Sequence, residues 1–531
     1  MSAPGLNVSA LDLNLSARDL HGAPVLVVGA GIMGLGIAQV AAQAGHAVML
    51  HDMREGAALD AKTKLAASLQ ALVAKGKLTA DAAAQTLARI TPIGTLEDAA
   101  SAALVVEAIV EKLDAKRSLF KQLEALVAAD CVLATNTSSI SVTAIANGLQ
   151  RPQRLVGMHF FNPVPLMKLV EVVSGLQTSP AVAQAIFALC QAWGKVAVHT
   201  RSTPGFIVNR IARPYYAETL ALLQEQAATP AVLDACLRAA GFRMGPCELM
   251  DLIGHDTNFS VTQSVYEANF CDKRFVPSLV QRDLVDGGLL GRKSGRGFYD
   301  YAEGAAKPAI AAFEPVALPQ AQSLCVHGRG PVAERLADAL AQAGRAFSRD
   351  GRSGWTGLAV DGAQLRLTGG QPASQLGAEV AVFDLPLAGG SGAALAWAPS
   401  SRASDSWVNQ APQWLRALGF NPQRVADAPG LVVARTIAML VNEAMDAVHQ
   451  GVCTREGADA AMKLGVNYPA GPFEWLAGWD AGAIAALLDA LDAHYRGERY
   501  RVSPLLRQRV WAQAALCSQE PAALSAQLEV A

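Results

Sequence analysis

Three glycines with G-x-G-x-x-G spacing, Gly29, Gly31 and Gly34, constrain this chain more than any other feature. They follow an apolar run at residues 25–28 that is rich in β-branched side chains, as is typical of a short buried strand. A helical pattern follows the glycines and runs to Gly45, which predicts the end of the helix. The stretch therefore predicts a strand–turn–helix unit.

The chemistry of this turn suits a dinucleotide. Gly29 allows the tight turn, Gly31 lets the backbone approach a pyrophosphate, and Gly34 lets helix and strand pack closely. The N-terminus of the helix offers unpaired N–H groups to the phosphates. Asp52 ends the next apolar run, where it can accept hydrogen bonds from a ribose and repel a 2′-phosphate, so NAD is favoured over NADP. The alternative is a glycine-rich turn in another α/β fold.

Composition excludes several classes of function. The 531 residues suggest three or four domains, and the net charge of −2 without a long basic run argues against a nucleic-acid partner. The eight cysteines show no C-x-x-C or metal-ligand spacing, so we expect reduced thiols, no metal and a cytoplasmic location. The first 20 residues lack the features of a secretory signal, and no apolar run is long enough to cross a membrane.

A long helical region is expected after Asp52, over residues 55–76 and on to residue 90. Ser68, Lys75 and Lys77 lie on it. From the residues alone, these side chains are interpreted as part of a solvated helix face.

Polar side chains follow two further predicted strands. Residues 104–106 lead into Glu107 and Glu111, and the run 131–134, after a predicted helix, leads into a polar cluster that contains Ser138. Ligands of open parallel sheets bind beyond the carboxyl ends of the strands. Ser138 is therefore a candidate site residue, although a serine here can also cap the following helix.

His159 and Glu171 are predicted to pair. His159 follows an apolar run at residues 155–158, and Glu171 lies inside another at 169–173. A buried glutamate is rare unless it is paired. A carboxylate that holds one ring nitrogen orients the histidine and makes it a better base. A purely structural pair is the alternative.

The second half of the chain repeats the first. A G-x-G-x-x-A turn spans residues 328–333, with Gly351 at the position equivalent to Asp52. Residues 429–435 mirror 204–210, and 471–474 mirror 245–248. We therefore expect an N-terminal arm (1–20), a doubly wound Rossmann-type α/β domain (21–203), an all-α helical domain (204–302), a linker (303–320), a degraded Rossmann-like domain (321–428), a second helical domain (429–515) and a tail (516–531).

These motifs resemble the 3-hydroxyacyl-CoA dehydrogenase family. The resemblance is close over residues 21–302, and the second half resembles, more weakly, the duplicated helical domain of longer members. It implies NAD-dependent oxidation of a (3S)-3-hydroxyacyl-CoA to the 3-oxoacyl-CoA. The motifs that carry it are GAGIMG at 29–34, EAIVE at 107–111, NTSS at 136–139, HFFNPVPLMKLVE at 159–171 and TPGFIVNR at 203–210.

The resemblance implies a role for each matching position. His159 would be the general acid and base, Glu171 would orient it, and Ser138 and Asn209 would hold the substrate's 3-oxygen. Ser68 and Lys75 fall where the family binds coenzyme A. The positions implied to contact NAD are Gly29, Gly31, Ile32, Met33, Gly34, Asp52, Glu111, Lys116, Ser138, Asn162 and Lys293.

Two other classes are weighed against this interpretation. NAD-dependent 6-phosphogluconate-type and 2-hydroxy-acid dehydrogenases share the fold but are not expected to show HFFNP before a buried glutamate. A non-catalytic NAD-binding scaffold would not need Ser138, His159, Glu171 and Asn209 together.

Within the family, the layout and residues 209–216 resemble the members that act on 3-hydroxyadipyl-CoA in phenylacetate breakdown. Members that act on 3-hydroxybutyryl-CoA in fatty-acid or butanoate metabolism are the alternative. Arg213, one helical turn after Asn209, would bind the distal carboxylate, unless it is a surface arginine.

The second half is expected to be a built-in partner that forms an intramolecular pseudo-dimer of helical domains. Residues 431–445 would be buried against the first helical domain, while a homodimer of whole chains stays open. The second turn lacks an acid at Gly351, so we expect poor NAD affinity there.

Overall fold

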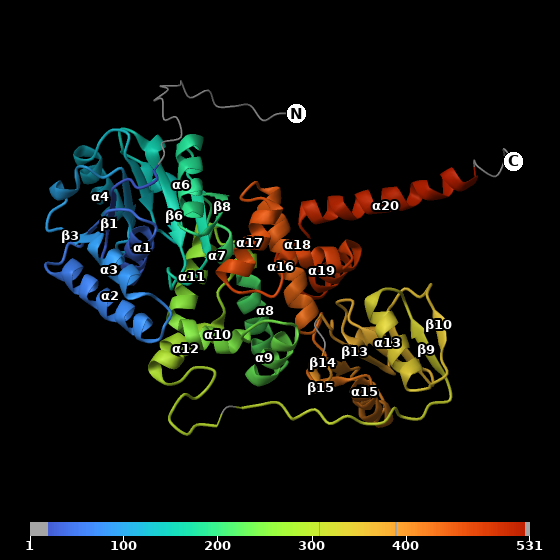
Figure 1. Ribbon diagram of the computed structural model, residues 1–531. Coiled ribbons are helices and arrows are strands. Elements are labelled where there is room, and N and C mark those ends of the chain that lie inside the picture. The colour runs from blue at the N-terminus through green and yellow to red at the C-terminus, as the bar shows by residue number, and fades with distance from the viewer. Residues whose placement is uncertain (1–19, 307, 388–389, 526–531) are drawn as a thin grey trace. The chain divides into compact units, whose positions relative to one another are not determined.

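The computed structural model describes residues 20–306, 308–387 and 390–525 (Figure 1). The chain divides into two units, each described by itself. Unit 1 comprises the residues up to Ile207 together with Val452–Gly465, and unit 2 comprises Val208–Gly451 and the residues from Val466 onward. No helix among the described residues is long and apolar enough to cross a membrane.

Unit 1 is built on an eight-stranded sheet of order β3-β2-β1-β4-β5-β6-β7-β8. Strands β1 to β6 are parallel, β7 is antiparallel to β6, and β8 is parallel to β7. The strand order reverses between β1 and β4, which is where sheets of this topology bind dinucleotides. The strands are β1 Val25–Val28, β2 Val48–His51, β3 Ile90–Pro92, β4 Leu104–Glu107, β5 Val132–Thr135, β6 Leu155–Phe160, β7 Leu169–Ser174 and β8 Val196–Arg201.

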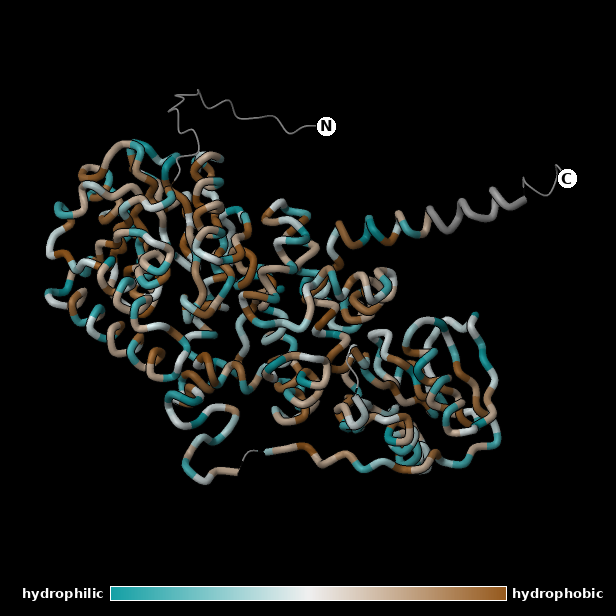
Figure 2. The backbone as a smooth tube through the Cα atoms, viewed as in Figure 1, coloured by the Kyte–Doolittle hydropathy of each residue, from teal (hydrophilic) through white to brown (hydrophobic). Residues whose placement is uncertain are grey.

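Helices cover both faces of this sheet, and hydrophobic strands lie between them (Figure 2). One core includes residues of α1, α2, α3 and α6, and the opposite core includes residues of α4 and α5. This confirms the doubly wound Rossmann-type domain. The helices are α1 Ile32–Gln43, α2 Ala57–Ala74, α3 Ala80–Ala88, α4 Leu113–Leu126, α5 Val142–Ala146 and α6 Pro180–Ala192.

The long helical region expected to reach residue 90 is interrupted. Helix α2 ends at Ala74, and Gly76 follows with a φ of +65°, which breaks the helix. Helix α3 starts anew after Thr79, whose hydroxyl accepts the N–H of Ala82 at 3.2 Å. The alanine-rich pattern continues across the break, so periodicity alone did not indicate it.

The helices of unit 2 come from both helical regions of the sequence. Helix α16 lies against α8, and every residue of 431–445 is buried, as expected. The helices of the first region are α7 Val208–Ile211, α8 Arg213–Gln224, α9 Pro230–Ala239, α10 Pro246–Ile253, α11 His255–Ala268 and α12 Leu279–Asp286. Those of the second are α16 Val433–His449, α18 Pro472–Gly478, α19 Ala481–Tyr495 and α20 Pro504–Ser525, the last running beyond residue 516, where a tail was expected.

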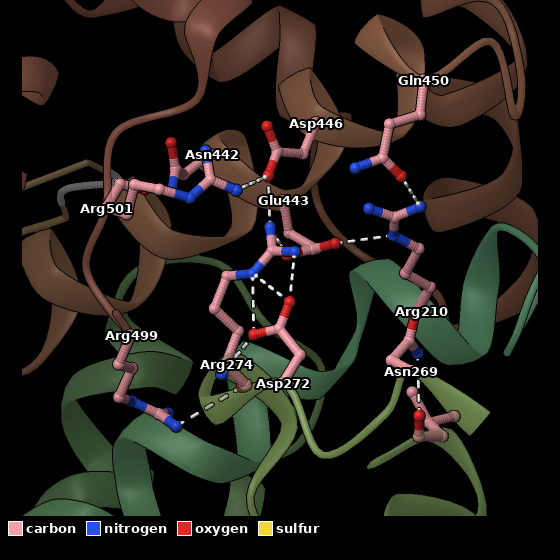
Figure 3. Close-up of polar contacts among 11 residues, drawn as sticks. Arg210, Asn269, Asp272, Arg274, Asn442, Glu443, Asp446, Gln450, Arg499 and Arg501 are labelled. Atoms are coloured by element: carbon pink, nitrogen blue, oxygen red, sulfur yellow. Dashed lines mark hydrogen bonds and ion pairs between the residues drawn. The ribbon is translucent and has the colours of Figure 1, made fainter. Parts of the chain in front are cut away.

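Charged side chains join these two regions inside unit 2 (Figure 3). The guanidinium of Arg274 contacts Asp272, Glu443 and Asp446. Arg210 donates to Gln450 at 2.8 Å.

A second, seven-stranded sheet also lies in unit 2, with order β10-β9-β11-β12-β13-β14-β15. This sheet retains the first strand–helix–strand unit of a Rossmann-type fold, because β9 and β10 are parallel. The next strand differs, because β11 is antiparallel to β9. This is the degraded Rossmann-like copy. Its elements are β9 Leu324–His327, α13 Pro331–Gln342, β10 Ser348–Asp350, β11 Gly357–Val360, β12 Ala363–Leu367, α14 Ala373–Leu376, β13 Val380–Phe383, β14 Ala393–Pro399, α15 Asp405–Ala417 and β15 Phe420–Arg424.

Each sheet carries a helix from the more distant helical region. Helix α17 (Arg455–Gly465) packs against β7 and β8 in unit 1, and the N–H of Arg201 donates to the carbonyl of Val452 at 2.9 Å. In unit 2, α9 packs against β14, and the N–H of Ala426 donates to the carbonyl of Ala227 at 2.8 Å. The two hydrogen bonds are equivalent, because both partners shift by 225 positions (426 − 201 and 452 − 227).

Candidate active site

A cavity of about 780 Å³ opens at the carboxyl ends of β1, β2 and β4. It is lined by Gly29, Gly31 and Asp52, among others. A Cβ atom on Gly29 would approach the carbonyl oxygen of Ala108 to 2.5 Å, whereas one on Gly31 would meet nothing within 4 Å. The turn is thus tightly packed at Gly29 and open at Gly31, which fits a dinucleotide whose pyrophosphate approaches the backbone at Gly31.

Asp52 is fixed at the edge of this cavity. Its carboxylate accepts the N–H of Ala30 at 2.9 Å and the N–H of Arg54 at 3.0 Å. Burial opposes ionisation, but these hydrogen bonds outweigh it and lower the pKa of Asp52. The side chain is therefore an oriented anion, as ribose recognition requires.

Lys116 is buried between two carboxylates. Its Nζ atom lies 2.6 Å from Glu107 Oε1 and 3.1 Å from Glu111 Oε2, and only 1% of its side chain is exposed. Glu107 is also buried, and it accepts the Thr135 hydroxyl at 2.6 Å. Glu107 had no predicted role. The signal was present in the sequence, because an acid at the end of the apolar run 104–106 needs a buried partner.

Glu111 holds the loop that carries Ser138. Its Oε1 atom accepts the Thr137 hydroxyl at 2.5 Å and the N–H groups of Ser138 at 2.9 Å and Ser139 at 3.2 Å. Burial opposes ionisation of Glu111, but Lys116 and these hydrogen bonds lower its pKa. Glu111 therefore links the β4 loop to the β5 loop.

His159 and Glu171 face each other on neighbouring antiparallel strands. Nδ1 of His159 lies 2.5 Å from Oε2 of Glu171, and the other carboxylate oxygen accepts the N–H of Ile207 at 3.0 Å. The rings of Phe161 and Phe206 lie 4.5 and 5.7 Å from the imidazole ring. The pairing is as predicted, and it engages Nδ1 of His159, so the carboxylate fixes the orientation of the ring.

Four other predicted positions in unit 1 lie at the surface. Ile32 is 79% exposed at the start of α1, and Asn162 is exposed after β6. Ser68 and Lys75 are exposed on α2 and at its C-terminal cap. Seven residues separate them, about two helical turns, so they share a face. Met33 is half-buried against the core below α1.

Asn209, Arg213 and Lys293 belong to unit 2. Arg213 is buried, which contradicts the alternative of a surface arginine. Nζ of Lys293 lies 2.5 Å from the carboxylate of Asp256, and the hydrogen bond from Lys293 lowers the pKa of Asp256. The buried Asp251 accepts the N–H groups of residues 298–299, which follow the short turn Arg292–Ser294 that carries Lys293.

The second copy has no counterpart of the His159–Glu171 pair. The N–H of Asp384 donates to the carbonyl of Ala396 at 2.9 Å, which places these two residues opposite each other. His159 and Glu171 lie opposite each other in the same way in the first sheet. Asp384 instead accepts the N–H groups of residues 432–434 at the start of α16.

The second glycine turn has different neighbours from the first, although Gly330, like Gly31, has open space where a Cβ atom would lie. Because β11 runs antiparallel to β9, its start lies beside the turn, and a Cβ atom on Gly328 would meet Thr356 Oγ1 at 2.4 Å. Trp355 stacks on His327 with ring centres 4.2 Å apart, and Arg366 lies over the indole at 4.6 Å.

Three family models match the chain. The 3-hydroxyacyl-CoA dehydrogenase NAD-binding domain matches residues 24–203. The C-terminal domain of the same family matches twice, over residues 205–301 and 430–516. The reduced Rossmann-fold domain of 3-hydroxybutyryl-CoA dehydrogenase matches residues 365–429. The chain belongs to the 3-hydroxyacyl-CoA dehydrogenase family.

Relatives with and without the duplication are similar to it. The 3-hydroxyadipyl-CoA dehydrogenase of Escherichia coli (strain K12) is 43% identical over 91% of this chain and 97% of that protein. The probable 3-hydroxybutyryl-CoA dehydrogenase of Bacillus subtilis (strain 168) is 42% identical over 52% of this chain and 97% of its own. A crystal structure titled 3-hydroxybutyryl-CoA dehydrogenase from E. coli K12 has 42% identity and a TM-score of 0.84, covering 93% of this chain and 99% of that one. The chain is thus an NAD-dependent oxidoreductase that acts on 3-hydroxyacyl-CoA.

Proposed function

We propose that this 3-hydroxyacyl-CoA dehydrogenase oxidises 3-hydroxyadipyl-CoA in the cytoplasm, as a step of phenylacetate breakdown. The observation that carries the proposal is the similarity to the E. coli 3-hydroxyadipyl-CoA dehydrogenase over nearly the whole of both chains. The second candidate is 3-hydroxybutyryl-CoA, which the names of the B. subtilis relative and of the E. coli crystal structure favour.

His159 is the proposed general base. Its Nε2 atom takes the proton of the 3-hydroxyl, and Glu171 holds Nδ1 so that the ring keeps the required tautomer. Bound NAD supplies the hydride acceptor for C3. Ser138 and Asn209 donate hydrogen bonds to the 3-oxygen and stabilise the charge that develops there. In the reverse direction, protonated His159 returns the proton.

The proposed cofactor site follows the glycine turn. The backbone of residues 29–34 faces the pyrophosphate, and Asp52 accepts the hydroxyls of the adenosine ribose. Glu111, Lys116, Ser138, Asn162 and Lys293 complete the proposed NAD contacts. Ser68 and Lys75, which share one exposed face of α2, are the proposed coenzyme A contacts.

The second helical region is proposed to act as a built-in partner of the first. The reciprocal hydrogen bonds of Arg201 and Ala426 support this, because a shift of 225 positions relates them as two subunits would be related. A tandem copy keeps its partner at high effective concentration. A fragment that ends near residue 303 should therefore aggregate or associate. A soluble, monomeric and fully active fragment would contradict the proposal.

Steady-state kinetics test the substrate. We expect a kcat/KM for 3-hydroxyadipyl-CoA at least about tenfold above that for 3-hydroxybutyryl-CoA, because a matched charge contact contributes roughly 1.5–3 kcal/mol. A higher value for 3-hydroxybutyryl-CoA would support the second candidate instead.

A further inference from the structure

A cavity of about 420 Å³ lies inside unit 2, between the two helical regions. The first region contributes Arg213 and Tyr216 from α8 and Thr262 from α11, and the second contributes Tyr495 and Tyr500. Three further cations line it, namely Lys273, Arg496 and Arg499, together with the acids Glu225 and Glu498. The cavity is therefore partly aromatic and carries an excess of positive charge.

Arg213 is a buried cation with neutral partners. It is 5% exposed, its Nε atom donates to the carbonyl of Asn209 at 2.9 Å, and a terminal nitrogen donates to Thr262 Oγ1 at 3.0 Å. The ring centre of Tyr216 lies 4.9 Å from the guanidinium carbon. Across the described residues no carboxylate forms an ion pair with Arg213. Burial lowers its pKa, opposed only by the phenols of Tyr216 and Tyr468.

Other buried arginines of unit 2 differ in this respect. Arg210, Arg274 and Arg435 each pair with at least one carboxylate. The position that matches Arg213 in the second helical region (213 and 438, a shift of 225) is Ala438, which is buried in α16. The fold of the helical region thus does not need a cation here. A buried cation without a counter-charge is costly, so an anion from outside the chain is expected to complete the site.

We propose that Arg213 binds the distal carboxylate of the acyl chain, with the cavity as the end of the acyl pocket. This rests on the proposed function, in which Asn209 holds the 3-oxygen. Arg213 begins α8 four positions after Asn209 of α7, and its Nε atom donates to the carbonyl of Asn209 at 2.9 Å, so the guanidinium lies close to Asn209. In an adipyl chain only three C–C bonds of about 1.5 Å separate C3 from the carboxylate carbon, so a carboxylate on a chain held at Asn209 is within reach of Arg213. A butyryl chain ends one bond beyond C3 and does not reach the guanidinium.

The proposal gives the second helical region a part in specificity. Its segment 495–500 forms one wall of the cavity, and Arg496 is exposed at the rim. Arg496 therefore attracts the dicarboxylyl substrate without holding it, whereas Arg213 holds the carboxylate.

The test compares 3-hydroxyadipyl-CoA with 3-hydroxyhexanoyl-CoA, which has the same chain length but no distal carboxylate. In Arg213→Gln, kcat/KM for the adipyl substrate should fall about 10- to 100-fold, as loss of a hydrogen bond between charged groups predicts. The hexanoyl value should stay within about threefold, which also shows that the variant is folded. Arg213→Lys should lie between the two. Arg238→Gln, whose side chain is half exposed and lines no part of this cavity, is the matched control and should leave both substrates unchanged.

Arg496→Gln should lower the adipyl value by about two- to fivefold at low salt and not at high salt, as a rim charge does. The proposal is overturned if the wild-type protein prefers the adipyl substrate and Arg213→Gln keeps that preference, or if this variant loses both substrates equally. If the wild-type protein has no such preference, the adipyl substrate itself is wrong.

Discussion

Nε of Arg210 lies 2.6 Å from Oε1 of Glu443, and the same pair recurs with the roles of the two helical regions exchanged. Nε of Arg435 lies 2.7 Å from Oε2 of Glu218. The arginines of the two pairs are 225 positions apart (435 − 210), and so are the glutamates (443 − 218). The same shift relates a second set of ion pairs, Arg274 with Glu443 and Arg499 with Glu218. Each glutamate thus receives two guanidinium groups, both from the opposite helical region, as at a two-fold interface.

Breaking one of these pairs should be costly. Glu218 is fully buried, and Glu218→Ala would leave Arg435 and Arg499 without their shared carboxylate. Removal of one partner of a buried pair costs about 3–5 kcal/mol. Chemical denaturation measures this loss. The control is Asp286→Ala, which removes an exposed ion pair to Arg282 and should cost less than about 1 kcal/mol. Similar losses for both variants would show that the buried pair contributes no more than a surface pair.

His159→Ala should reduce kcat by about 10²–10⁴-fold, the usual contribution of a positioned acid or base. NADH affinity should be nearly unchanged, because Asp52 and the glycine turn keep their own hydrogen bonds. Stopped-flow turnover and fluorescence titration measure the two effects. Retention of more than about a tenth of kcat would be incompatible with proton transfer by this residue.

Asp52→Ala should weaken NADH binding and reduce discrimination against NADPH. The oriented carboxylate excludes a 2′-phosphate by repulsion, and the variant removes that charge. The ratio of KM values for NADPH and NADH is the measurement. An unchanged ratio would show that another group selects the cofactor.

Short local sequence motifs made much of unit 1 predictable. The turn at Gly29–Gly34, Asp52 and the pairing of His159 with Glu171 all follow from local spacing and from the rule that buried acids are paired. The register that places Asp384 opposite Ala396 was not predictable, because the second copy keeps no recognisable residues there. The side chains that pair with Arg210 were also not predictable, because sequence periodicity carries no information on contacts between residues more than 200 positions apart.

The pH dependence of stability should include a contribution from Asp384. Burial raises its pKa to about 6, although the N–H groups of residues 432–434 oppose the shift. The folded protein therefore binds this proton more tightly than the unfolded chain, whose aspartates titrate near 3.9. Stability from this group is present below about pH 4 and is lost as pH rises through about 6, by at most about 3 kcal/mol. Unfolding of the wild-type protein relative to Asp384→Asn, which cannot titrate, should reveal this slope. Parallel pH profiles for the two proteins would contradict it.

One NADH should bind per chain. In the second copy, Gly351 occupies the position equivalent to Asp52, so the acid proposed to bind the ribose is missing there. Calorimetric titration should give a stoichiometry near one, and Asp52→Ala should weaken that single site. Two sites of comparable affinity would overturn this expectation.

Helices α9 and α17 each pack against the sheet of the other half of the chain, and this arrangement limits when the first sheet can finish folding during synthesis. Strands β7 and β8 leave the ribosome about 250 residues before α17, the helix that packs against them. At 5–20 residues per second, this interval lasts roughly 10–50 s. During this interval part of the apolar surface of the nascent first sheet is uncovered. A chaperone that binds unfolded chains would have its largest effect on the yield of active enzyme in this period.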